Sequence, residues 1–284
     1  MELSIIIVNY NSRRLIEQCL QSLQKAIRGL NTEIIIIDNH STDGSEDFLQ
    51  TLSPDHTVIF NNQNIGFAKA CNQGFLQSSG KYVLFLNPDT VVSENCFEKC
   101  ISFFESHPDA GAVGVRMINE EGKFLKESKR GFPSPSAAFY KLFGFTFLFP
   151  RSKVFSKYYA GHLPEMGNNP VEVLSGAFMM VRKELLRQTG AFDESFFMYG
   201  EDIDLSYRVM QAGFQNYYLG EITITHLKGG STTFNREYLN RFYGAMNLFV
   251  KKHYEGKRGS FFVSSLYAGI WFRKMIATAG LLFR

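Results

Sequence analysis

The sequence predicts an α/β protein with a mostly parallel sheet flanked by helices and a helical extension at its carboxyl end. Two observations predict this fold class. Apolar runs rich in Ile and Val alternate with segments of helical periodicity through residues 3–118. Asn and Asp side chains follow one apolar run after another. In a chain of 284 residues, 45% hydrophobic and 20% charged, the alternation indicates one large domain with an appendage.

The first half of the chain repeats a strand and a helix. Helices are expected at about 12–27, 46–51, 67–77 and 94–107, because apolar residues recur there at helical spacing. This order of elements is typical of βαβ units and a parallel sheet. The expected buried strands are LSIIIVNY (3–10), EIIIIDN (33–39), TVIFNN (57–62), KYVLFLNPD (81–89) and AGAVGVRMIN (110–119).

The rhythm is lost after residue 118. The next 52 residues or so resemble a loop in which basic and aromatic residues are interleaved. The pattern resumes at 171–186, where a strand runs into a helix, and a helix over 202–211 and a strand ending at His226 follow. A further helix is expected at 235–254.

The carboxyl-terminal segment 259–284 is apolar and aromatic, but Arg273 and Lys274 interrupt it. A membrane span needs about 20 apolar residues, so a crossing is not expected. Two readings stay open, a helix lying on a membrane surface and a helix packed against protein.

Composition narrows the partners and the compartment. The net charge of +3 is small and the basic residues are not clustered, so no nucleic-acid partner is expected. The four cysteines fall in predicted helices without a CxxC pair, which indicates reduced thiols. The chain opens directly on a strand-like segment, so no signal peptide is visible and we expect a cytoplasmic protein.

Polar side chains follow four of the predicted strands. In parallel sheets ligands bind outside the carboxyl ends of the strands, so these side chains predict a polar ligand. Asn and Asp are also ordinary turn residues, and for any single position that reading stays open. The residues are Asn9, Asn11, Asp38, Asn39, Asn61 to Asn64, Asn87 and Asp89.

Asp89 is the sharpest candidate for a metal ligand in the first half. A hard cation such as Mg²⁺ or Mn²⁺ takes oxygen ligands and bridges the protein to substrate phosphates. A turn Asp that caps its own backbone is the alternative. His226 ends a later strand, where it is either structural or a second ligand to the same ion.

The segment GEDID, residues 200–204, places three acids at the start of a helix. Acids in a first turn stabilise the helix dipole, and that is the structural alternative. A carboxylate within hydrogen-bond reach of a sugar hydroxyl would also serve as a general base. Gly66 permits a close backbone approach to a nucleotide, but the GxGxxG and GxxxxGK[ST] spacings of dehydrogenases and kinases are missing.

Taken together, the motifs resemble the family 2 inverting glycosyltransferases, most closely the rhamnosyltransferase-like branch of bacterial polysaccharide biosynthesis in the cell envelope. The resemblance covers roughly residues 3–255 in the right order. Its motifs are IIIVNYNS, IIIDNHSTDGS, NIGFAKACNQG, LFLNPD, LSGAFMMVRK, FDESFFMYGEDIDLSYR and THLKGGST.

The resemblance implies a GT-A fold, which is Rossmann-like with a mixed, mostly parallel sheet. It divides the chain into a nucleotide-sugar-binding half (1–118), an acceptor-binding and catalytic half of the same domain (119–255) and an amphiphilic helix (256–284). It implies Mg²⁺ or Mn²⁺ as cofactor, a nucleoside-diphosphate-sugar donor and a saccharide or lipid-linked saccharide acceptor. Peripheral contact with the inner membrane face through 259–284 fits such an acceptor.

The resemblance also implies roles for particular residues. Asp202 matches the catalytic base, with Glu201 beside it, and Asp89 and His226 match the metal ligands. Gly176 would lie near the donor sugar or the acceptor. The implied donor-binding residues are Val8, Asn9, Tyr10, Asn11, Asp38, Asn39, Gly66, Phe67, Asn72, Asn87 and Asp89.

One departure bears on the metal. Asn87 stands where the family has the first acid of its DxD motif, so one carboxylate is missing. The expected activity is inverting transfer of a sugar, rhamnose favoured, to a hydroxyl of a growing lipid-linked polysaccharide. Two alternatives stay open: a catalytically inactive nucleotide-sugar-binding module, and a sugar nucleotidyltransferase, whose Gly-rich loop on the first strand is absent here.

Overall fold

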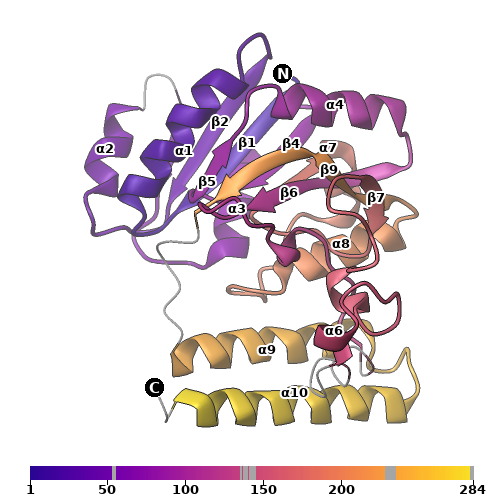
Figure 1. Cartoon of the computed structure of the whole chain (residues 1–284). Coiled ribbons are helices and arrows are strands. Elements are labelled where there is room, and N and C mark those ends of the chain that lie inside the picture. Colours follow the sequence, from indigo (N-terminus) through magenta and orange to yellow (C-terminus); the bar gives the residue numbers. More distant parts are fainter. Residues whose placement is uncertain (53–55, 135, 137–139, 141–144, 228–234, 282–284) are drawn as a thin grey trace.

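A nine-stranded mixed sheet forms the centre of the protein, and helices cover both of its faces (Figure 1). The computed structural model describes residues 1–52, 56–134, 136, 140, 145–227 and 235–281. The strands lie in the order β3-β2-β1-β4-β8-β6-β9-β5, and β7 pairs with β9. They are β1 (Leu3–Asn9), β2 (Thr32–Asp38), β3 (Thr57–Phe60), β4 (Tyr82–Leu86), β5 (Thr90–Val92), β6 (Ala110–Ile118), β7 (Asn168–Val171), β8 (Phe178–Arg182) and β9 (Gln215–His226).

The amino-terminal half of the sheet is parallel. Strand β1 lies between β2 and β4 and is parallel to both, and β3 continues the sheet beyond β2. All seven residues of β1 are buried, as the unbroken apolar run predicts for a strand covered on both faces. Because the chain turns one way to β2 and the other way to β4, the order of strands reverses beside β1. Ligands in open α/β sheets bind at such a reversal.

The other half of the sheet is mixed. Strand β8 enters antiparallel between β4 and β6, and β9 is parallel to β6 and antiparallel to β5 and β7. Strand β6 runs in the same direction as β4, because both are antiparallel to β8, which lies between them. The sheet as a whole is mixed and mostly parallel, as predicted.

The helices form two layers on the sheet. Side chains of α1 (Arg13–Ala26), α2 (Ser45–Thr51) and α4 (Cys96–Ser106) pack with Leu3, Ile5 and Ile7 of β1. Side chains of α3 (Phe67–Gln77), α7 (Lys183–Thr189) and α8 (Glu201–Gln211) pack with Ile6 and Val8 of the same strand. The alternation of a strand thus sends successive residues into opposite layers. All four cysteines are buried and free, as expected.

Two long helices form a further layer beside α8. Helix α9 (Arg236–His253) and helix α10 (Ser260–Leu281) run side by side in opposite directions at the lower edge of Figure 1. Ile203 of α8, Phe249 of α9 and Leu266 of α10 belong to one buried cluster. In the described part of the chain, none of the helices has the length and apolar character that a membrane crossing requires.

The described residues between β6 and β7 form little regular structure, as the loss of periodicity predicts. It contains two short 3₁₀ turns, η1 (Lys126–Ser128) and η2 (Lys157–Tyr159), and the one-turn helix α6 (Phe145–Leu148). The domain boundaries that the resemblance implies stay a prediction.

Candidate active site

A cavity of about 390 Å³ opens at the carboxyl ends of β1 and β4, where the order of strands reverses. Residues from both halves of the chain line it, so the fold brings together positions that are far apart in sequence. The cavity also reaches the amino-terminal part of α9. The predicted site residues that line it are Val8, Tyr10, Asn39, Phe67, Asn87, Asp89, Gly176, Glu201, Asp202 and His226.

Three of the other predicted donor residues build the turn behind the cavity. Asn9 is buried and donates through Nδ2 to Asp38 Oδ1, at 2.8 Å. Asp38 in turn accepts from the hydroxyl of Ser41 at 2.7 Å. Asn11 accepts through Oδ1 from the backbone N–H of Thr42, at 2.7 Å. These side chains hold the loops after β1 and β2 together and do not line the cavity.

A second turn is shaped by Gly66 and Asn39. Gly66 has φ +88°, and a Cβ atom there would lie 2.7 Å from the carbonyl oxygen of Phe197. The next residue donates its backbone N–H to that same oxygen at 2.8 Å. Asn39 Nδ2 donates to Asn64 Oδ1 at 3.0 Å. The glycine is therefore required because the loop leading to α8 lies against it.

Asn72 also contacts that loop instead of the cavity. Its side-chain amide donates to the carbonyl oxygen of Phe192 at 2.8 Å, and its carbonyl accepts from the N–H of the same residue at 3.0 Å. Gly66 and Asn72 thus position the segment before α8. The predicted contact of Asn72 with a base or ribose lacks support from this arrangement.

Asp89 and His226 meet at one end of the cavity because β5 pairs with the end of β9. Asp89 Oδ1 and His226 Nε2 lie 3.1 Å apart, and the Leu227 N–H donates to the Asp89 carbonyl at 2.8 Å. The carboxylate oxygen is buried and has no hydrogen-bond partner among the described residues. Adjacent ligands of an octahedral cation at about 2.1 Å lie about 3 Å apart, so the pair fits a shared divalent ion.

The same end of the cavity offers few protein ligands. No group of three His, Cys, Asp or Glu side chains in the described part of the chain is placed to hold a metal ion. Asn87 lines the cavity, and its backbone N–H donates to the carbonyl of Ala177 at 3.0 Å. A cation here would need further oxygen ligands from a substrate. Residues 228–234, which include the Lys-Gly-Gly-Ser stretch after His226, lie outside the described residues.

Asp202 also lines the cavity, from the first turn of α8. Gly200 has φ +82° and lets the chain turn into the helix. Asp202 Oδ2 accepts from the backbone N–H of Gly176 at 3.1 Å and from the guanidinium of Arg130. Its Oδ1 accepts from the N–H of Ile203 at 2.8 Å. The carboxylate therefore has a defined orientation at the cavity wall.

Glu201 lies in different surroundings from its neighbour. Its side chain is buried, and Oε2 has no hydrogen-bond partner among the described residues. Burial, and then the nearby negative charge of Asp202, raise the pKa of Glu201 to about 8. At neutral pH this carboxyl is mostly protonated, whereas the carboxylate of Asp202 is paired with a cation.

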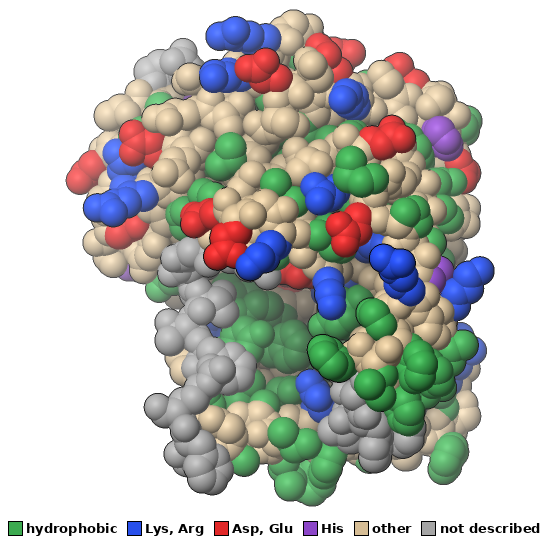
Figure 2. All heavy atoms as spheres, viewed as in Figure 1, with side chains coloured by type: hydrophobic (Ala, Val, Ile, Leu, Met, Phe, Trp, Pro, Cys, Tyr) green, Lys and Arg blue, Asp and Glu red, His purple; other side chains and the backbone are tan. Residues whose placement is uncertain are grey.

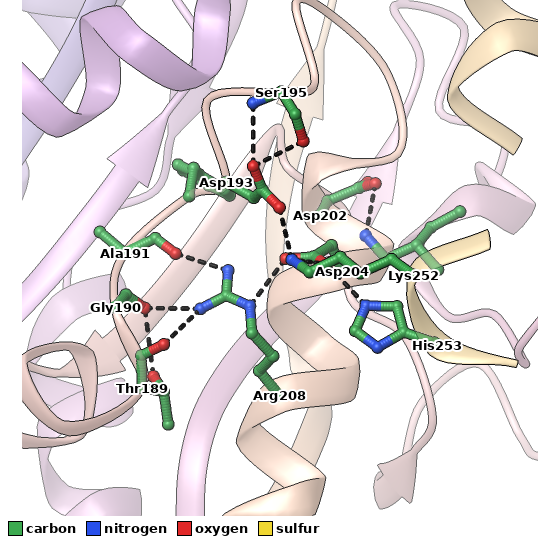
Figure 3. A network of polar contacts seen from close by, with 12 residues as sticks. Thr189, Gly190, Ala191, Asp193, Ser195, Asp202, Asp204, Arg208, Lys252 and His253 are labelled. Atoms are coloured by element: carbon green, nitrogen blue, oxygen red, sulfur yellow. Dashed lines mark hydrogen bonds and ion pairs between the residues drawn. The ribbon is translucent and has the colours of Figure 1, made fainter. Parts of the chain in front are cut away.

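A polar cluster anchors α8 to its neighbours (Figure 3). Asp204 is fully buried, and its carboxylate accepts from Arg208 Nε, Lys252 Nζ and His253 Nε2, each at 2.7 Å. Arg208 also donates to the carbonyls of residues 189–191, and Lys252 to Asp193. Although burial raises the pKa of Asp204, the bond from His253 and the charge of Arg208 lower it overall to about 2.

Comparison with known proteins decides the family. The model of the glycosyl transferase family 2 matches residues 4–190. The chain belongs to glycosyl transferase family 2. The matched segment includes all of the predicted donor residues, Asp89 among them, whereas α8 and His226 follow it.

Curated relatives of this family 2 chain include a rhamnosyltransferase and a hexosyltransferase. It is 28% identical over 242 residues to N-acetylglucosaminyl-diphospho-decaprenol L-rhamnosyltransferase of Mycobacterium tuberculosis. The aligned region covers 81% of this chain and 77% of that relative. It is 29% identical over 230 residues to the low-salt glycan biosynthesis hexosyltransferase Agl10 of Haloferax volcanii, 78% of this chain and 65% of that one. The resemblance found in the motifs is confirmed at the level of the family.

Solved structures confirm the GT-A fold of this family 2 chain. S. aureus TarS in complex with UDP-GlcNAc aligns with a TM-score of 0.60 at 17% identity, over 95% of this chain and 72% of that one. The mannosyltransferase PcManGT of Pyrobaculum calidifontis, in complex with GDP-Man and Mn²⁺, aligns with a TM-score of 0.61 at 17% identity, over 98% and 72%. At these identities the likeness concerns the fold.

Several residues at the site of this family 2 chain were not predicted. Tyr238 and Arg241 of α9 line the cavity, as does Tyr199 before α8. Arg130, from the irregular segment after β6, bonds to Asp202. The helical pattern of 235–254 predicted α9 itself, but nothing in it shows that the helix begins beside the cavity. Arg130 lies in a stretch without periodicity, where the sequence carries no signal of position.

Proposed function

We propose that the chain transfers a sugar, with inversion, from a nucleoside-diphosphate sugar to a hydroxyl of a lipid-linked saccharide. One observation supports this most. In a member of family 2, two side chains spaced as cation ligands and a carboxylate suited to base chemistry line one cavity, at the carboxyl ends of parallel strands. A diphosphate beside Asp89 and a reacting hydroxyl beside Asp202 would place the sugar between them.

The donor end would hold the diphosphate. Asp89 and His226 supply one oxygen and one nitrogen ligand, and phosphate oxygens would complete the shell of Mg²⁺ or Mn²⁺. A cation there supplies charge stabilisation of the diphosphate and fixes its position. The nucleoside would lie toward Val8, Tyr10 and Asn39. We favour rhamnose as the sugar because the mycobacterial relative is named as a rhamnosyltransferase.

The acceptor end would use Asp202 as general base. The carboxylate takes the proton of the acceptor hydroxyl, whose oxygen attacks the anomeric carbon as the bond to the diphosphate breaks. Attack from the face opposite the leaving group inverts the configuration at that carbon. The Gly176 N–H and the Arg130 guanidinium hold the carboxylate in place for this step. Glu201, mostly protonated at neutral pH, adds little negative charge beside it.

A lipid-linked acceptor would bring the protein to a membrane. Large apolar side chains are exposed on α10 and around α6. Figure 2 shows hydrophobic side chains gathered in the lower part of the molecule. Arg273 and Lys274 lie on the same helix α10. Apolar residues together with cationic ones favour the interface of an anionic membrane. Of the two readings of segment 259–284, we therefore propose the membrane-surface one; residues 282–284 lie outside the described residues.

The test is a donor screen followed by a transfer assay. Nucleoside-diphosphate sugars, including UDP-GlcNAc, GDP-mannose and a nucleoside-diphosphate rhamnose, are titrated by calorimetry with and without Mn²⁺. The best donor is then assayed with prenyl-diphosphate-linked monosaccharides. Asp202→Asn should lower kcat by about 10²–10⁴-fold, because the general base is lost, with the donor Kd unchanged.

The outcomes separate the alternatives. Donor binding without transfer or hydrolysis in the unchanged chain would favour an inactive binding module. Pyrophosphorolysis of the donor in place of transfer would favour a nucleotidyltransferase. Near-normal transfer by Asp202→Asn would show that another group acts as the base.

A further inference from the structure

A second cavity lies beside Asp202, between the start of α8 and α9. Its volume is about 100 Å³. It shares Tyr199, Glu201 and Asp202 with the 390 Å³ cavity described above, which we call the donor cavity. Asp89 and His226 line the donor cavity but not this one. The proposed base therefore stands at the boundary between two cavities. Figure 2 shows a hollow with hydrophobic side chains between the sheet and the layer of α9 and α10.

The polar wall of this cavity carries hydrogen-bonding groups that the protein does not satisfy. Glu201 is 7% exposed, and its Oε2 has no partner among the described residues. The Nε of Arg130 is likewise buried and without a described partner, although the Nη2 atom donates to Asp202 and to the Leu174 carbonyl. Buried polar atoms almost always have partners, so two residues of one cavity wall that each keep an unsatisfied atom favour a polar ligand beside them.

The opposite wall is apolar. Phe242, Met246 and Phe249 project from α9, and Pro133 comes from the segment after β6. The rings of Phe249 and Phe132 stack 6.2 Å apart beneath this wall. Aromatic and aliphatic side chains facing a few convergent polar groups are typical of sites that bind small organic ligands. A pyranose ring has such a character, with an apolar C–H face and hydroxyls at its edge.

We infer that this cavity is the subsite for the sugar that receives the transferred residue. The inference rests on the proposed function and adds the location and the walls of the acceptor site. The acceptor hydroxyl must approach the anomeric carbon from the side opposite the diphosphate, and this cavity touches Asp202 but neither Asp89 nor His226. Arg130 and Glu201 bond to hydroxyls of the acceptor sugar, and Phe242 and Met246 cover its C–H face.

Filling the cavity tests the subsite. Met246→Trp places a larger ring in the space that the acceptor sugar needs, whereas Asn247→Trp makes the same change at the next, exposed position of α9, which does not line the cavity. We expect Met246→Trp to raise the KM for the acceptor by about tenfold or more, the size of effect that one misfitting group has in a pocket. The donor Kd and the rate of donor hydrolysis by water should stay within about twofold, since the donor cavity is untouched.

The acceptor probe is the best substrate from a panel of prenyl-diphosphate-linked and octyl-linked monosaccharides. An unchanged acceptor KM in Met246→Trp, or an equal rise in Asn247→Trp, overturns the subsite. So does intact donor hydrolysis with no transfer to any saccharide of the panel. A chain that binds no nucleoside-diphosphate sugar overturns the proposed function itself. Met246→Phe is the second variant if the Trp side chain prevents folding, which thermal unfolding monitors.

Discussion

Glu201 and Asp202 are neighbours in sequence, yet the start of α8 turns their carboxyl groups into different surroundings. Asp202 reaches the cavity wall, where Arg130 and the Gly176 N–H bind it. Glu201 turns into a buried space where one of its oxygens has no described partner. The first arrangement suits a group that must be ionised to accept a proton. The second suits a neutral acid that donates a hydrogen bond.

The raised pKa of Glu201 makes stability depend on pH. Between its ordinary value of 4.5 and about 8, the folded chain keeps a proton that the unfolded chain has lost. The free energy of unfolding therefore falls as pH rises through this window. Glu201→Gln mimics the neutral acid and should remove that part of the slope. Urea unfolding at pH 5, 6.5 and 8 measures it.

The control for Glu201→Gln is the same substitution at an exposed carboxyl group. Glu194→Gln changes an exposed side chain and should leave the pH slope as it is. The kcat of Glu201→Gln at pH 7 should stay within about tenfold of the unchanged chain, because the protonated form is retained. An unaltered slope in Glu201→Gln would show that the carboxyl titrates normally.

At single positions, sequence reasoning could find residues that follow a strand or begin a helix. Asp89, His226 and Asp202 were predicted in this way, and the structure places them around one cavity. Asn72 was assigned to the nucleotide from its motif, but its amide binds the backbone of Phe192. The motif alone does not show whether a polar side chain contacts a ligand or stabilises a loop.

At the scale of elements, the Asp204 cluster joins three parts of the chain. It links α8 to the end of α9 through Lys252 and His253, and to the loop 189–195 through Arg208 and Asp193 (Figure 3). The residues of the apolar core could be predicted from periodicity, but this cluster could not, because it joins residues 193, 204–208 and 252–253 from three separate parts of the chain.

Asp204→Asn should lower the free energy of unfolding by about 3 kcal/mol, because Arg208 and Lys252 lose their buried counter-charge. The value is at the low end for a buried pair, since the side chain of Lys252 is 32% exposed. Since the pKa of Asp204 is lowered to about 2, this stability is present above its ordinary value of 3.8 and is lost as pH falls toward 2. Guanidinium unfolding at pH 7 and pH 3 measures both effects.

Asp193→Asn is the matched control at the edge of the same cluster. It removes one contact of Lys252, which keeps its bond to Asp204. We expect a loss of about 1 kcal/mol or less, as for exposed ion pairs. Equal losses in the two variants would mean that Asp204 is not the centre of the cluster.

The strands themselves could be predicted well, because unbroken apolar runs mark those covered on both faces. Their pairing could be predicted only in the first half, where short βα connections force neighbouring strands to be parallel. The position of β8 between β4 and β6 depends on contacts made after the irregular segment 119–170. Local pattern contains no information about that insertion.

At the scale of the whole molecule, the pair of α9 and α10 has two different sides. One side packs on α8 and lines both cavities through α9. The outer side of α10 exposes large apolar residues, among them Phe261 at 89% and Trp271 at 62%. An arrangement of this kind would bring the acceptor end of the site close to any surface that α10 binds.

The unchanged chain should therefore bind anionic lipid vesicles and bind neutral ones more weakly. Each basic residue near an anionic surface contributes about 1 kcal/mol, and a buried aromatic side chain about 1.5–3 kcal/mol. Replacing Phe261 and Trp271 together by Ser should weaken vesicle binding by about tenfold or more. Co-sedimentation with phosphatidylglycerol and phosphatidylcholine vesicles measures the bound fraction.

Leu76→Ser provides the matched control for vesicle binding, because Leu76 is 79% exposed but lies on α3. It should leave vesicle binding unchanged, since the effect belongs to one face and not to exposed apolar area in general. The double variant should keep its kcat on a short-chain, water-soluble acceptor, because neither residue lines the two cavities that share Asp202. It should lose activity on a long-chain acceptor embedded in vesicles. Equal vesicle binding by all three proteins would leave α10 as a helix that only covers the catalytic domain.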